Sequence, residues 1–242
     1  LLYQALSWDP PSFAHIPMIL SREGRKLSKR EGAEGISELR EKGYLPEAVR
    51  AYLATLSWAV EGEDFLFDPD AMAQAFDLCS ISRSSPIHDE NRLRWWGNKA
   101  LKQKDALWLA ERLMAIARER DLKPSCSSTT LASLLPEALS DQATIIEVFD
   151  SLIWLFMRPQ KSDEMPLWME ELAKELSGVG RWDKEEIERV LKAFQRKLGI
   201  KAKEFFHPIR MAITGSHWGP PLPLVMEVLG KEEVLFRLKQ EN

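Results

Sequence analysis

The sequence predicts a mainly α-helical fold, and two patterns within its 242 residues indicate this. From Leu45 onward, apolar side chains recur every three or four positions, the spacing that places them on one side of a helix. Only residues 13–20 have the short, apolar and Pro-interrupted character of an edge strand. Ordinary fractions of hydrophobic residues (45%) and charged residues (29%) exclude the collagenous, disordered and disulfide-scaffold classes.

The first elements are a helix-like segment and the strand-like segment. Residues 1–6 are apolar at helical spacing but begin without Met and without a helix start signal, as the middle of a helix would. We therefore expect this chain to be the C-terminal part of a longer protein. Residues 8–11, with two consecutive prolines, break that helix, and residues 13–20 then lead into a polar turn that contains Gly24.

The remaining elements are predicted helices. Residues 183–198 form the clearest one, with Asp183 and Glu186 as a capping-box-like start and Gly199 as the stop. Residues 123–130 are small or polar and contain a Pro, which predicts a linker with a domain boundary nearby. Helices are expected to begin at or soon after Pro46, Asp68, Ser84, Asp105, Asp141, Asp183 and Pro223. The stripe of the first of these comprises Val49, Leu53 and Leu56.

Charge and apolar runs limit the classes of partner. Lys and Arg total 33 against 37 Asp and Glu, a formal net charge of -4, so affinity for nucleic acid must come from a local basic patch. The longest wholly apolar run, residues 152–157, is far shorter than a membrane span requires. We expect a cytoplasmic protein with no membrane partner.

Cysteine and histidine spacing predicts no metal site. Cys79 and Cys126 lack neighbouring ligands and have the pattern of small buried hydrophobic residues in a reducing compartment. The sequence also lacks the nucleophile-elbow, P-loop and zincin motifs, so it gives those hydrolase and kinase classes no support. Structural roles are expected for the four scattered histidines, which are His15, His88, His207 and His217.

The densest basic cluster follows the turn at Gly24. Five cations fall within nine residues against one acid: Arg22, Arg25, Lys26, Lys29 and Arg30. A turn that presents two Lys and a Ser can fold over a polyphosphate, because lysine ammonium groups act as mobile point charges toward phosphate oxygens. The alternative is a solvated basic loop, since motifs this short also occur by chance.

A second cationic segment, residues 92–104, interleaves basic and aromatic side chains. Trp and Arg make sequence-tolerant contacts with RNA bases and backbone, which predicts a nucleic-acid surface. The alternative is a core Trp surrounded by solvated cations, and we expect one of Trp95 and Trp96 to be buried and the other partly exposed. The candidate nucleic-acid contacts are Arg83, Arg92, Arg94 and Lys102.

Four blocks, in order, resemble the bacterial-type glutamyl-tRNA synthetases of class I. The strand-like F-A-H-I-P-M-I-L, the turn and K-L-S-K-R are similar to the KMSKS region of that family. Residues 43–58 resemble the helix after this loop, and residues 75–98 resemble the segment that enters the anticodon-side helices. Residues 205–230 are similar to the closing R-V-A-L-T-G and G-P-x-L signature.

The chain also departs from the pattern of that family. Ser57 stands where a Gly is usual, and His88 stands where an apolar residue is common. The Asn of W-G-N is spaced differently as well. These departures affect local packing and tRNA contacts, and they do not touch the loop of residues 26–30.

The resemblance implies a ligase reaction, in which ATP activates glutamate to glutamyl-adenylate and the glutamyl group passes to tRNA. Lys29 matches the second Lys of the motif, which contacts the ATP phosphates and stabilises the departing pyrophosphate. Lys26 supports it, and the full ATP-phosphate set implied is Lys26, Leu27, Ser28, Lys29 and Arg30. Mg²⁺ accompanies ATP. The adenosine-binding His-Ile-Gly-His segment and the glutamate pocket lie upstream in this family, so we expect this portion alone to be inactive.

The implied fold is a small mixed α/β stem-contact unit at residues 1–100, followed by all-α anticodon-binding domains at residues 101–160 and 161–242. The implied partner is tRNA for glutamate, with acceptance of tRNA for glutamine left open. We expect a monomer, because no predicted helix has an apolar face left over after its core stripe. The alternative is a non-catalytic helical RNA-binding or interaction module derived from a synthetase. Exchange of ATP with pyrophosphate in the presence of glutamate distinguishes the two.

Overall fold

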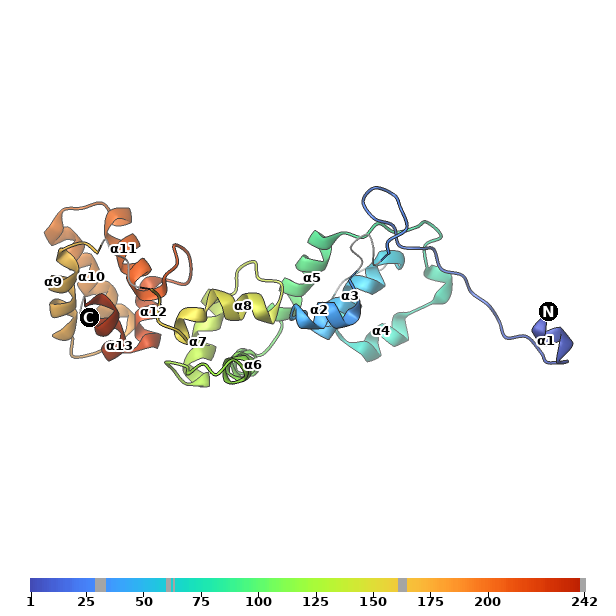
Figure 1. Ribbon diagram of the computed structural model, residues 1–242, viewed down its shortest axis with the longest axis horizontal. Coiled ribbons are helices and arrows are strands. Elements are labelled where there is room, and N and C mark those ends of the chain that lie inside the picture. The colour runs from blue at the N-terminus through green and yellow to red at the C-terminus, as the bar shows by residue number, and fades with distance from the viewer. Residues whose placement is uncertain (29–33, 60–61, 63, 161–164, 240–242) are drawn as a thin grey trace. The chain divides into compact units, whose positions relative to one another are not determined.

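The computed structural model describes residues 1–28, 34–59, 62, 64–160 and 165–239, and the chain is mainly helical as predicted (Figure 1). It divides into two compact units, Leu1–Ala100 and Leu101–Asn242. β-Structure in the described part is limited to isolated bridges, which join Leu20 with Lys26, Leu20 with Ile87, and Trp58 with Ile81. No helix in these described ranges is long and apolar enough to cross a bilayer.

In its described residues, the first unit is built from short helices and two 3₁₀ turns. Proline pre-sets the backbone at the start of the third helix, and the Asp68 carboxylate accepts a hydrogen bond from the Asp70 N–H at the start of the fourth. Its elements are α1 (Leu2–Ala5), α2 (Ile36–Glu41), α3 (Pro46–Ser57), η2 (Asp64–Phe67), α4 (Pro69–Ala75), η3 (Leu78–Ser80) and most of α5 (Glu90–Lys102).

Two predictions for this unit are wrong in detail. The strand expected at residues 13–20 is reduced to the bridges of Leu20, because the side chains before it are mostly exposed and pair with no neighbouring strand. The stripe predicted for α3 is confirmed in part, since Val49 is buried and Leu56 is half-buried, but Leu53 is 46% exposed. Ala48 and Tyr52, which the stripe did not include, are buried. The helical period was right, but the buried face of α3 extends to one side of the predicted one.

The second unit is wholly helical in its described part. Some of its helices begin at side-chain caps: Asp105 accepts from the Trp108 N–H and Asp183 from the Glu186 N–H, each at 2.9 Å. The elements are α6 (Ala106–Glu119), α7 (Ser128–Ala138), α8 (Ile145–Ser151), η4 (Ile153–Leu155), α9 (Trp168–Ser177), α10 (Lys184–Leu198), α11 (Ala202–Thr214), α12 (Leu222–Leu229) and α13 (Lys231–Leu238). The clearest helix of the sequence, ended by Gly199 in the left-handed conformation, is confirmed.

The linker predicted at residues 123–130 is not a boundary. The Ser125 N–H donates to the Leu155 carbonyl at 2.8 Å, and Ser127 caps α7, whose Leu131 is buried. α7 packs against α6, so small polar residues here make a tight turn inside the unit. The border between the units instead falls after Ala100. A separation of residues 101–160 from 161–242 stays a prediction.

The helix expected from Asp141 begins later. The Thr144 side chain caps it by accepting from the Glu147 N–H at 3.1 Å, so the first helical residue is Ile145. α8 ends at Ser151, and the chain continues as η4 rather than as one helix to Phe156.

A buried arginine connects three elements of the second unit. Arg237 of α13 donates to the Ile213 carbonyl at 2.6 Å, to the Trp154 carbonyl at 2.9 Å and to Glu233 at 2.7 Å. Arg158 makes a further ion pair with Glu233 at 2.8 Å. Because a buried charge is tolerated only when it is paired and hydrogen-bonded, this arrangement stabilises the contact of α13 with α11 and η4.

Candidate functional site

The turn at the start of the basic cluster is a tight hairpin, which we call the Lys26 hairpin and define as residues 20–27. The Ser21 N–H donates to the Arg25 carbonyl at 2.7 Å, and the Gly24 N–H donates to the Ser21 carbonyl at 3.0 Å. Gly24 has a φ of +75°, which favours glycine over residues with a Cβ atom. The bridge between Leu20 and Lys26 closes the hairpin and presents Lys26 at its end.

The residues predicted to hold ATP phosphates are placed only in part. Lys26 is exposed, and Leu27 and Ser28 are half-buried directly after the hairpin. Lys29 and Arg30 lie outside the described residues. An exposed ammonium beside a serine hydroxyl fits an anionic phosphate, since both groups can donate hydrogen bonds to its oxygens.

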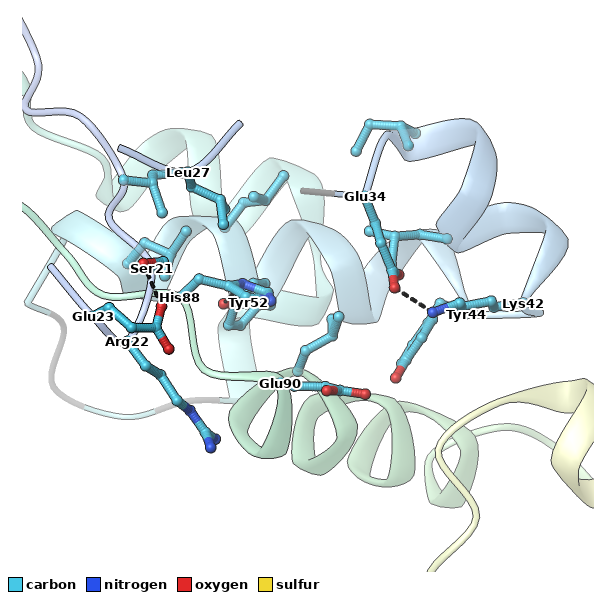
Figure 2. Close-up of a pocket in the computed structure, with 16 residues that line it drawn as sticks. Ser21, Arg22, Glu23, Leu27, Glu34, Lys42, Tyr44, Tyr52, His88 and Glu90 are labelled. Carbon is cyan, nitrogen blue, oxygen red and sulfur yellow. Dashed lines mark hydrogen bonds and ion pairs between the residues drawn. The ribbon is translucent and has the colours of Figure 1, made fainter. Parts of the chain in front are cut away.

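A pocket of about 370 Å³ lies between the Lys26 hairpin and the helices α2, α3 and α5 (Figure 2). Leu27 lines the pocket from the hairpin. An ion pair between Glu34 and Lys42 lies at the right of the view. The hydrogen bond that Lys42 donates to the Glu34 carboxylate raises the pKa of Lys42. The polar lining includes Ser21, Arg22, Glu34, Lys42, Tyr52 and His88.

One side chain of α3 joins the pocket to the start of α5. The Tyr52 hydroxyl lies 2.6 Å from Nδ1 of His88, and it accepts a hydrogen bond from the Asp89 N–H at 3.1 Å. Burial raises the pKa of Tyr52, so the hydroxyl remains protonated at neutral pH. His88, which departs from the pattern of the resembled family, therefore has a defined polar partner.

Asp89 connects the hairpin with α5. Its carboxylate accepts from the Asn91 N–H at 3.0 Å, which caps the helix, and it pairs with Arg22 at 3.2 Å. Burial raises the pKa of Asp89, but the Arg22 guanidinium and the backbone donors outweigh it, and the pKa lies below its usual value. The pair is exposed, so its own contribution to stability is small.

One face of α5 carries a cationic and aromatic surface, which we call the α5 face and define as Arg92, Trp95 and Lys99. These residues are three and four positions apart, so they lie on one side of the helix. Trp95 is 46% exposed and Trp96 is fully buried, which confirms the expected split. Lys99 Nζ lies 5.2 Å from the Trp95 ring centroid.

The other predicted nucleic-acid contacts do not share that face. Arg94 is two positions from Arg92 and therefore points to a different side of α5. Arg83 lines a separate pocket of about 420 Å³, together with residues 14–17, 78–79 and 81–82. Lys102 is exposed at the end of α5 and belongs to the second unit.

The sequence reasoning missed an exposed loop in the second unit, residues 215–221. Trp218 is 86% exposed, and the His217 ring stacks on His207 with centroids 4.4 Å apart. Arg210 supports the loop by donating to the Pro220 carbonyl at 2.9 Å, and burial lowers the pKa of Arg210. The sequence did contain a signal for this exposed ring, namely a Trp beside Gly-Pro-Pro in a loop, where a side chain has no neighbouring core to pack into.

Comparison with known families assigns both units. Residues 109–241 match the anticodon binding domain family, and residues 1–95 match the catalytic domain of the class I tRNA synthetases (E and Q). The first match alone covers more than half of the chain. The chain therefore belongs to the class I tRNA synthetases of the E and Q type, as part of a catalytic domain joined to an anticodon-binding domain.

Two solved structures share this fold. A glutamate tRNA ligase from Elizabethkingia meningosepticum, in complex with its amino acid, superposes with a TM-score of 0.82 at 24% identity. A glutamate-tRNA synthetase from Elizabethkingia anophelis superposes with a TM-score of 0.79, also at 24% identity. Each alignment covers 98% of this chain and 52% of the solved chain, so the chain spans about half the length of these structures.

Proposed function

We propose that this chain is the part of a glutamate-tRNA ligase that supplies the KMSKS loop and contacts tRNA. The parent reaction is the attachment of glutamate to tRNA for glutamate, through glutamyl-adenylate formed from ATP. The observation that carries the proposal is the combination, in one chain, of the Lys26 hairpin inside the catalytic-domain match and an all-helical anticodon-binding domain after it. Both matched structures are named as ligases for this amino acid.

The Lys26 hairpin serves the first step, adenylate formation. ATP arrives with Mg²⁺ on its phosphates, and charge accumulates on the departing pyrophosphate as the glutamate carboxylate attacks the α-phosphate. Lys26 and Lys29 act as cations positioned against that charge, and Ser28 donates its hydroxyl to a phosphate oxygen. Interactions of this kind lower the barrier because they are stronger in the transition state than with bound ATP.

Two exposed surfaces serve tRNA binding. On the α5 face, Arg92 neutralises a phosphate and Trp95 offers a ring for stacking. In the 215–221 loop, Trp218 offers an exposed ring in the domain that matches anticodon binding. Arg83, Arg94 and Lys102 remain proposed phosphate contacts. We place the parent enzyme in the cytoplasm and expect it to act as a monomer.

The proposal is tested on two levels. A salt-titrated gel shift of this chain, with transcripts of tRNA for glutamate that carry altered anticodons, separates counterion release from base recognition. Binding that depends on the anticodon supports the proposal. ATP–pyrophosphate exchange with glutamate is then measured for this chain alone and for the parent protein. Activity is expected only for the parent, and an inactive parent that still binds RNA would favour the non-catalytic module.

A further inference from the structure

The hydroxyl of Tyr52 is a buried polar group to which the proposed function assigns no role. Tyr52 is 3% exposed on α3, and its oxygen accepts from the Asp89 N–H at 3.1 Å. A phenol has one proton, and the closest acceptor for it is Nδ1 of His88 at 2.6 Å (Figure 2). The hydroxyl thus satisfies one group on each of two consecutive residues, although Tyr52 precedes them by more than thirty positions.

The segment that Tyr52 contacts, residues 86–89, is also the support of the Lys26 hairpin. The Leu20 N–H donates to the Pro86 carbonyl, and the His88 N–H donates to the Leu20 carbonyl, each at 2.8 Å. These bonds form the parallel bridge between Leu20 and Ile87. The hairpin therefore rests on the same short segment that the Tyr52 hydroxyl fixes to α3.

Loss of the hydroxyl has a local consequence that can be stated in advance. The Asp89 N–H and the His88 ring nitrogen would both lose a partner in a partly buried place, which costs more than a hydrogen bond exposed to water. The 86–89 segment would then open more often, and the hairpin with it. A lysine ammonium contributes to the rate only when it is positioned to within about 1 Å of the phosphate oxygens, so a more mobile hairpin should lower the rate of adenylate formation.

We propose that Tyr52 is a positioning residue for the Lys26 hairpin, which it holds in place through His88 and Asp89 of the 86–89 segment. The inference rests on the proposed function, because it assigns the hairpin to adenylate formation. Asp89 also caps α5, so the same anchor joins the hairpin to the helix that carries Arg92.

Hydrogen exchange in the full 242-residue chain tests the anchor itself. In Tyr52→Phe, the amides of Leu20, Leu27 and His88 should exchange about five- to tenfold faster, the effect of one lost partly buried hydrogen bond. Amides elsewhere in α3 should be unchanged. Tyr3→Phe, the same substitution on an exposed helix, is the matched control. Unchanged hairpin amides, or an equal increase throughout the first unit, would overturn the proposal.

Kinetics of the parent protein test the consequence. Tyr52→Phe should lower kcat for ATP–pyrophosphate exchange about five- to tenfold, with KM for glutamate and affinity for tRNA unchanged. Loss of structure alone would instead affect all of these together. A wild-type parent without exchange activity contradicts the proposed function. An active wild type with an unchanged kcat in Tyr52→Phe contradicts only the positioning role.

A double-mutant cycle with His88→Leu separates the polar pair from simple packing. Tyr52→Phe leaves the His88 ring nitrogen and the Asp89 N–H without their partner, and His88→Leu leaves the Tyr52 hydroxyl without one of its partners. The double variant removes both members of the Tyr52–His88 pair. The double variant should therefore lose less kcat than the product of the two single losses. Losses that multiply would show that Tyr52 and His88 act independently, which contradicts the proposed anchor.

Discussion

The two units of the chain bury their side chains in different ways. In the first unit, Leu66 and Trp96 are fully buried between helices, but the Lys26 hairpin is held by backbone hydrogen bonds to a distant segment. In the second unit, Phe149 and Phe194 are fully buried within packed helices. The proposed catalytic element is therefore held by a few polar contacts, whereas the helices of the second unit are held by buried apolar side chains.

The largest expected effect concerns the buried arginine of the second unit. Arg237→Met should destabilise that unit by roughly 3 kcal/mol, because the Ile213 and Trp154 carbonyls lose their donors and Glu233 loses one of its two cations. Urea unfolding followed by circular dichroism measures the change. The control is Arg189→Met, which breaks an exposed pair on α10 and should cost less than about 0.5 kcal/mol.

The next effect concerns the chemistry assigned to the first unit. Lys29→Ala in the parent enzyme should slow adenylate formation by about 100-fold while tRNA affinity changes little, since the cation acts on charge that develops in the transition state. Single-turnover exchange and a filter-binding assay measure the two quantities. Lys192→Ala, on an exposed helix of the second unit, is the control. Equal losses in rate and binding would contradict a role in the transition state.

Aromatic stacking should produce smaller effects that differ between the units. Trp218→Ala should weaken binding of tRNA for glutamate about tenfold and reduce its dependence on the anticodon, because stacking contributes about 1–3 kcal/mol per base. Trp95→Ala should weaken binding without changing the anticodon preference. Gel shifts with wild-type and altered anticodons compare them, with Trp8→Ala as an exposed aromatic control. Identical behaviour of the two variants would remove the functional distinction between the units.

The smallest effect is a pH dependence of the second unit. Hydrogen bonding from Arg158, with help from Arg237, holds the pKa of Glu233 below its ordinary value. A carboxylate with a lowered folded-state pKa contributes stability that is complete above the unfolded value and is lost as pH falls through the folded value. The wild type should therefore lose about 1 kcal/mol more than Glu233→Gln between pH 5 and pH 3. Equal slopes in urea unfolding would show that the pair contributes nothing.

The sequence identified the candidate site in part. Local residue types were enough to predict the basic cluster, the turn at Gly24, and the burial of one of Trp95 and Trp96 with partial exposure of the other. The anchor at Tyr52 was not, because its partners lie more than thirty residues away and no local pattern marks a hydroxyl aimed at a distant backbone. The exposure of Trp218 was not predicted either, although its Gly-Pro-Pro loop is a local signal.

By itself, the sequence determined the mainly helical class and the helices with strong ends. Asp105 and Asp183 accept hydrogen bonds from backbone N–H groups in the first turn of their own helices. Gly199 adopts the left-handed conformation that ends its helix, which glycine does without steric cost. Each of these signals acts within a few residues. Only the tertiary structure shows that Leu53 of α3 is exposed while Tyr52 is buried, and that residues 123–130 form an internal turn. Those outcomes depend on which segments, far apart in the sequence, pack against one another and bury apolar surface. A pattern of neighbouring residues does not contain that information.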